Sequence, residues 1–109
     1  MLKLTIVVKK FETKAKKTFF KATAKGKYIP SVEVDDETYY TIKLHKPSKD
    51  GKSSEPIEVP QREGFYEVGI PSKKDLWLDT RAEMLGKNIF HVRASKIIFV
   101  ENLPVNVEK

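Results

Sequence analysis

The residue types that could support catalysis or metal binding are few in this sequence and widely separated. The two histidines, His45 and His91, fall on different predicted strands, and there is no cysteine. Neither histidine has the H-x-x-x-H or H-E-x-x-H spacing of a zinc site, and neither a G-x-S-x-G motif nor a phosphate-binding loop is present. The three adjacent acids at 35–37 are expected on a solvated loop. We therefore expect no catalytic residue, no metal and no cofactor, and the chain is not predicted to be an enzyme.

Lysines interleaved with aromatic residues indicate a different chemistry. The segment 16–30, KKTFFKATAKGKYIP, combines five lysines with three aromatic side chains. Lysines neutralise phosphates, and aromatic faces stack on unpaired bases. Alternation along this predicted strand and the next one places the candidate nucleic-acid contacts on the outward face or beside it. They are Lys16, Lys17, Phe19, Lys21, Thr23, Lys25, Lys27, Tyr39, Lys43 and His45.

The positive charge is concentrated in the first quarter of the chain. The formal net charge of the 109 residues is +6. Residues 1–28 hold nine lysines and one acid, whereas the other 81 residues hold twelve basic and fourteen acidic side chains. Such asymmetry favours a polyanionic partner, nucleic acid above all and an anionic membrane surface less often. The alternative is a lysine-rich hairpin that is simply solvated.

Outward aromatic residues have alternative explanations as well. Phe19 or Tyr39 could be covered by a loop, by Trp77 or by a second subunit, and a register slip of one residue would exchange the two faces of a strand. The leucines that flank Trp77 favour packing of that segment onto the sheet, although the sequence leaves open whether Trp77 faces a ligand.

The elements that must position these side chains are mostly strands. Apolar residues alternate over 2–8, 18–29 and 38–46, and shorter strands are predicted over 65–70, 89–94 and 96–101. Helical signals occur only within 72–88, where Thr80 and Glu83 have capping-box spacing and Gly86 suits a C-terminal cap. This helix is expected to be short, with a start at Thr80 or earlier, at Ser72 or Asp75.

This order of elements predicts a mainly β fold. We expect a small five-stranded Greek-key barrel of the OB type, with one short helix before the last strand. At 109 residues the chain is long enough for one domain, which is expected over 1–103 with a frayed tail over 104–109.

The segment FHVRASKIIFVEN resembles the closing strand of bacterial single-stranded DNA-binding proteins of the OB class. That strand has the pattern apolar-x-A-x-x-apolar-x-F-apolar-acid, which is filled here by Val92, Ala94, Ile97, Phe99, Val100 and Glu101. Small proteins of this kind are frequent in phages and conjugative elements of Gram-positive bacteria. The resemblance implies only the fold, because the family's tryptophans on the binding strands have no equivalents here. From the ending LPVNVEK we also expect no counterpart of the family's glycine-rich tail with its acidic, aromatic end.

The sequence therefore predicts a non-catalytic protein that binds single-stranded DNA, or RNA, with little sequence preference. The alternative is a protein-interaction or assembly module of a phage or conjugative element that binds no nucleic acid. We expect a cytoplasmic location, because no apolar stretch is long enough for a signal peptide or a membrane span. The edge of the strand LKLTIVV could pair with a second copy, which would give a homodimer.

Overall fold

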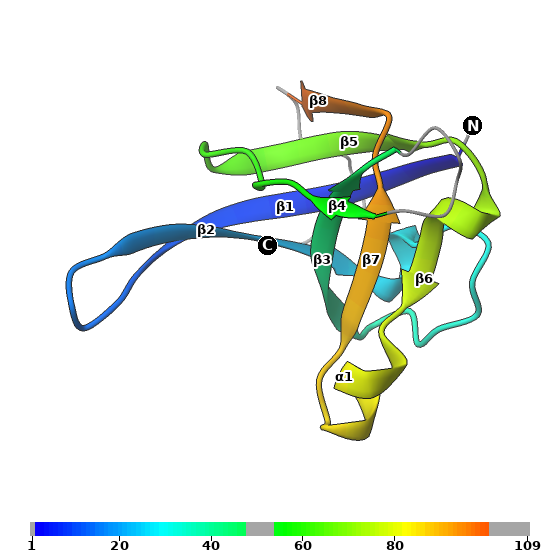
Figure 1. The fold of residues 1–109 in the computed structure, drawn as a ribbon, viewed down its shortest axis with the longest axis horizontal. Helices are drawn as coiled ribbons and strands as arrows, with labels where there is room; N and C mark the ends of the chain where they lie inside the picture. Colours follow the sequence, from blue (N-terminus) through cyan, green and yellow to red (C-terminus); the bar gives the residue numbers. More distant parts are fainter. Residues whose placement is uncertain (1, 48–53, 101–109) are drawn as a thin grey trace.

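The computed structural model describes residues 2–47 and 54–100, and within them the chain is mainly β with one α-helix (Figure 1). The helical elements are η1 (Gly26–Tyr28), η2 (Lys73–Asp75) and α1 (Thr80–Met84), of which the first two are 3-10 turns. The strands in chain order are β1 (Leu2–Glu12), β2 (Thr18–Lys25), β3 (Tyr39–Lys46), β4 (Glu55–Pro56), β5 (Gly64–Ile70), β6 (Leu76–Leu78), β7 (Ile89–Arg93) and β8 (Lys96–Val100). No helix in the described ranges is both long and apolar enough to cross a bilayer.

All strands belong to one sheet, in the order β6-β7-β3-β2-β1-β5-β8, with β4 paired to β3 outside this path. The pairs are antiparallel except β3 with β7, which is parallel. The central strands lie in the order β5-β1-β2-β3, in which the chain makes two hairpins and then returns beside its first strand. This is a Greek-key order.

The expected five-stranded barrel is wrong, because the described part of the chain forms a sheet of eight strands that does not close. After β7 the chain passes from one end of the sheet to the other through Ala94 and Ser95. The Ala94 amide donates to the carbonyl of His45 (3.0 Å), and the Ser95 amide donates to that of Gly69 (2.9 Å). The chain then continues as β8, paired with β5. These two residues therefore bridge β3 and β5 by single hydrogen bonds rather than by a continuous ladder.

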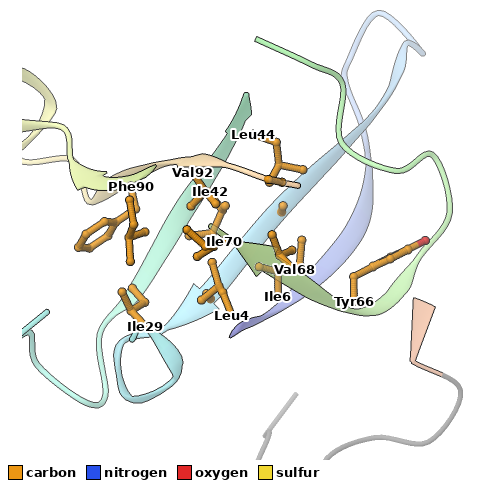
Figure 2. Close-up of a cluster of buried hydrophobic side chains, with 14 of the residues drawn as sticks. Leu4, Ile6, Ile29, Ile42, Leu44, Tyr66, Val68, Ile70, Phe90 and Val92 are labelled. Atoms are coloured by element: carbon orange, nitrogen blue, oxygen red, sulfur yellow. The ribbon is translucent and has the colours of Figure 1, made fainter. Parts of the chain in front are cut away.

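The core lies on the face predicted by the alternation of apolar residues (Figure 2). Leu4, Ile6 and Val8 of β1 are fully buried, and Ile42 and Leu44 of β3 pack with them. On β2 the inward residues are Ala22 and Ala24, whose small size allows the neighbouring strands to pack closely. Phe90 is the largest fully buried side chain, and its ring meets that of Tyr40 edge to face at 5.0 Å.

Strand β2 ends at Lys25 and not near residue 29, because the chain turns at Gly26. The Gly26 amide donates to the carbonyl of Thr38 (2.7 Å). A Cβ at this position would lie 1.9 Å from the Asp35 carbonyl oxygen, so only glycine permits this close approach. The turn brings the chain back to start β3 beside β2.

The helix is capped by Asp79 rather than by Thr80. The Asp79 carboxylate accepts from the Ala82 amide (2.9 Å), and the helix ends before Gly86, whose φ of 77° suits the predicted C-terminal cap. The preceding segment is not helical, because Leu76, Trp77 and Leu78 form β6 and pair with β7. Positions 101–109, which include Glu101 and the predicted frayed tail, lie outside the described residues.

Gly64 provides a test of the junction between β5 and β8. A Cβ there would lie 2.5 Å from the Phe99 ring, and φ is 148°, whereas at Gly86 a Cβ would have open space. Both substitutions place an alanine side chain at a positive φ, which lowers stability by about 1–3 kcal/mol. We expect Gly64→Ala to lower the free energy of unfolding by about 1–3 kcal/mol more than Gly86→Ala, because Phe99 must move. Urea unfolding of the two variants measures the difference, and equal losses would contradict the packing described.

Candidate functional site

A groove opens where β2 and β3 separate. Their ladder contains only the pairs of Thr23 with Thr41, Ala24 with Tyr40, and Lys25 with Tyr39. Beyond Thr23, β2 continues with β1 as a hairpin, while β3 continues beside β7 and β4. The groove between them has a volume of about 630 Å³. It is lined by residues 18–22 of β2, residues 41–45 of β3, the segment around β4 (Pro56, Ile57, Glu58, Val59, Gln61) and His91.

A second hollow of about 470 Å³ continues this surface toward the start of β3. The two hollows share Lys21, Thr41 and Lys43. The second is also lined by Tyr39, Lys87, Asn88 and Ile89. We call the two together the β2–β3 groove. Of the described residues that line it, three are lysines and only Glu58 is acidic, so its electrostatic potential favours an anion.

The hairpin of β1 and β2 projects from the rest of the molecule (Figure 1). The ladder between β1 and β5 ends where Val8 meets Gly64, so from residue 9 onward β1 pairs only with β2. Residues 9–21 hold six lysines and one acid. On one face of this hairpin the rings of Phe11 and Phe19 stack at 5.4 Å, and both remain more than 40% exposed. Phe19 also lines the groove, so the stacked pair adjoins it.

The backbone of β2 contributes to the same groove. Successive residues of an antiparallel strand direct their backbone groups to alternate sides. The Gly26 amide bonds toward the β3 side, at Thr38, so Ala22 and Phe20 direct their amide and carbonyl groups the same way. The β2–β3 ladder has ended at that point, and these two residues present an open strand edge to the groove.

Most of the predicted contact residues lie on or near this surface. Phe19, Lys21, Lys43 and His45 line the groove near the hairpin, and Tyr39 lines the part near Lys87. The others are placed as follows: Lys16 and Lys17 are exposed near the hairpin tip, Thr23 is half-buried in the ladder with β3, and Lys27 is exposed on η1 with its ammonium over the Tyr28 ring.

Two of the predicted contacts are buried rather than exposed. Lys25 is 8% exposed, and its ammonium lies 3.0 Å from the Glu37 carboxylate and over the Tyr39 ring. His45 is 7% exposed, and the ring of Trp77, from the edge strand β6, stacks on the imidazole at 5.7 Å. Trp77 itself is half-buried and is not among the residues that line the groove.

His45 and His91, expected to be unrelated, form a hydrogen-bonded chain with Asp79. His45 Nε2 lies 2.8 Å from His91 Nδ1, and His91 Nε2 lies 2.8 Å from Asp79 Oδ2. The parallel pairing of β3 with β7 brings the rings together by setting Lys43 opposite His91 and His45 opposite Arg93. Because the histidines are 46 residues apart, their spacing carried no signal of this contact.

Aromatic and charged side chains enclose this pair. Trp77 stacks on His91 at 5.4 Å, and the Arg93 guanidinium lies 4.8 Å from the Trp77 ring centre. Arg93 also donates to Asp75 (3.3 Å). Among the described residues, no group of three or more His, Cys, Asp or Glu side chains is placed to hold a metal ion.

The surroundings lower the pKa values of two members of this hydrogen-bonded chain, His45 and Asp79. Burial lowers the pKa of His45 below its usual 6.5, and the nearby His91 and Arg93 add to the effect. The amide of Ala82 and the hydrogen bond from His91 lower the pKa of Asp79 below its usual 3.8. At neutral pH His45 is therefore uncharged and Asp79 is a carboxylate.

Searches against protein-family models, curated proteins and solved structures found no match to this chain.

The lowered pKa of His45 predicts how stability depends on pH. Below pH 6.5 the unfolded chain binds a proton at this residue more readily than the folded one, so the free energy of unfolding should fall as the pH is lowered from 6.5 to 5. His45→Gln removes the titrating group but keeps an amide donor for His91. We expect a smaller fall for this variant in chemical unfolding at each pH. An identical pH dependence in the two proteins would contradict the burial of a neutral His45.

Proposed function

We propose that this protein binds single-stranded nucleic acid, single-stranded DNA in the first place, in the β2–β3 groove. The observation that carries the proposal is the arrangement of two exposed aromatic rings, Phe19 and Tyr39, with Lys21, Lys43 and Lys87 along one groove. Such a surface suits a flexible strand whose phosphates meet lysines and whose bases stack on rings. None of these contacts distinguishes one base from another, so binding is expected to show little sequence preference.

The topology supports the same proposal. OB folds are partly open Greek-key barrels whose second and third strands, with adjoining loops, bind oligonucleotides. Here the Greek-key order of β5, β1, β2 and β3 places the groove between the second and third strands. We propose that the sheet is an open and extended form of the OB arrangement, in which β7 and β8 correspond to one interrupted closing strand.

The electrostatic part of the proposal predicts a specific salt dependence. For single strands, each phosphate neutralised contributes about 0.7 to the slope of log affinity against log salt. Lys21→Gln combined with Lys43→Gln should reduce that slope by about 1.4 and weaken binding at low salt. Lys74→Gln combined with Lys96→Gln removes the same charge from exposed positions that do not line the groove, and should leave the slope unchanged.

Fluorescence anisotropy with a labelled oligonucleotide, repeated over a salt series, measures both slopes. If the two double variants changed the slope equally, the lysines would act only through net charge, and the groove would not be the site. An absence of binding by the wild-type protein at low salt would overturn the proposed function.

The stacking part predicts that Phe19→Ala and Tyr39→Ala each weaken binding by about 1–3 kcal/mol, the range found when a stacked base loses its aromatic partner. Met84→Ala is the matched control, because Met84 is a large exposed apolar residue on α1, outside the groove. The same anisotropy assay compares the three variants at one salt concentration. A loss for Met84→Ala as large as that for Phe19→Ala would exclude stacking as the cause.

The open edge of β2 favours a second candidate function, the binding of an extended peptide. Ala22 and Phe20 direct backbone groups into the groove, where an added strand could pair with them. The lysines of the hairpin would favour an acidic peptide over a second copy of this chain, whose own lysines would repel them. A competition experiment distinguishes the two candidates. If excess acidic peptide leaves the affinity for a single-stranded oligonucleotide unchanged, nucleic acid is favoured as the ligand.

A further inference from the structure

The direction of each hydrogen bond in the Asp79–His91–His45 chain is fixed by its carboxylate end. An ionised carboxylate only accepts, so His91 must donate to Asp79 from Nε2. In a neutral His91 the other nitrogen, Nδ1, then carries a lone pair. His45 must donate to it from Nε2, which leaves a lone pair on His45 Nδ1. This last nitrogen is buried and has no hydrogen-bond partner.

A hydrogen added to this nitrogen turns an unpartnered acceptor into an unpartnered donor, so the atom itself does not drive proton uptake. It does allow a change of tautomer that keeps the buried His45 neutral. When one proton from solvent adds to His45 Nδ1, the proton on His45 Nε2 can pass to His91 Nδ1. His45 stays neutral with its hydrogen on the other nitrogen, and His91 becomes an imidazolium with both nitrogens donating. The chain as a whole gains one proton and one positive charge.

The neighbouring charges favour that charge on His91 rather than on His45. Asp79 lies against His91, whereas Arg93 of β7 faces His45 and is paired with Asp75 of η2. Lys43 of β3 is in register with His91, and Lys21 and Glu58 line the same groove as both histidines. Positive lysines and the negative Asp79 carboxylate therefore lie on different sides of His91, and a phosphate bound in the groove would add a further negative charge beside it.

We infer that the Asp79–His91–His45 chain is a proton-binding site that adds a positive charge to the β2–β3 groove as the pH falls and so strengthens nucleic-acid binding there. The regulatory part of this inference rests on the proposed function, while the proton chain itself does not. Because coupling between two sites is reciprocal, a bound oligonucleotide raises the affinity of the chain for its proton by the same factor.

Asp79→Asn tests the inference with little disturbance of the fold, because asparagine caps a helix as well as aspartate does. We expect the wild-type protein to bind an oligothymidylate, whose bases do not titrate in this range, at least about fivefold more tightly at pH 5.5 than at pH 8 at constant ionic strength. The variant lacks the carboxylate that stabilises the imidazolium and should change less than twofold. His91→Gln, which keeps one donor and one acceptor, should behave like Asp79→Asn.

Nitrogen-15 chemical shifts of the histidine rings provide a measurement that needs no nucleic acid. At pH 8 both rings of the wild-type protein should carry their hydrogen on Nε2, and the first proton taken up should produce an imidazolium at His91. A hydrogen on Nδ1 of His45 at pH 8 would overturn the proton chain. Equal affinities at the two pH values would overturn the regulation alone, whereas no binding at either pH would overturn the proposed function and leave the ring shifts to decide on the chain.

Discussion

The short ladder between β2 and β3 is the constraint on which the rest of the site depends. Three residue pairs hold the two strands together, and each strand then follows a different partner. Strand β2 stays with β1 because their register continues for six pairs, to Glu12 and Thr18. Strand β3 stays with β7, which brings the C-terminal part of the chain into the sheet. A longer β2–β3 ladder would close the groove, pair the backbone of Phe20 and Ala22, and leave no recess between Lys21 and Lys43.

Strand β2 can carry lysines on one face while its other face packs into the core. Along β2 the inward positions are small and apolar, and the strand can lie close to its neighbours while every second side chain points to the other face. Phe19 and Lys21 lie on that face at the groove, and farther along β2 the strand pairs with β3 as far as Tyr39. Lys25 is the exception, since the turn at Gly26 brings Glu37 within ion-pair distance and withdraws the ammonium from the surface.

The parallel pairing of β3 with β7 has a separate chemical consequence. It places His45 and His91 side by side, with Trp77 stacked on both and a helix-capping carboxylate at the end. Asp79 therefore has two roles: one oxygen holds the first turn of α1, and the other fixes the hydrogen-bond direction of both imidazoles. The structure connects the helix cap to the wall of the groove through two rings.

The sequence by itself determined the longer strands and the identity of their inward faces, because the alternation of apolar residues is a local property that packing against one core preserves. It did not reveal the short strands β4 and β6, which are too short to show an alternating pattern. It also determined that lysine and aromatic side chains share the outer face of β2, and that the helix near Gly86 is short. Only the tertiary structure decided how many strands the sheet has and that it stays open, since this depends on where Ala94 and Ser95 bond. The ion pair of Lys25 and the contact of His45 with His91 were also beyond local reasoning. Both join residues brought together by a turn or by the parallel pairing of distant strands, and no spacing in the sequence encodes such contacts.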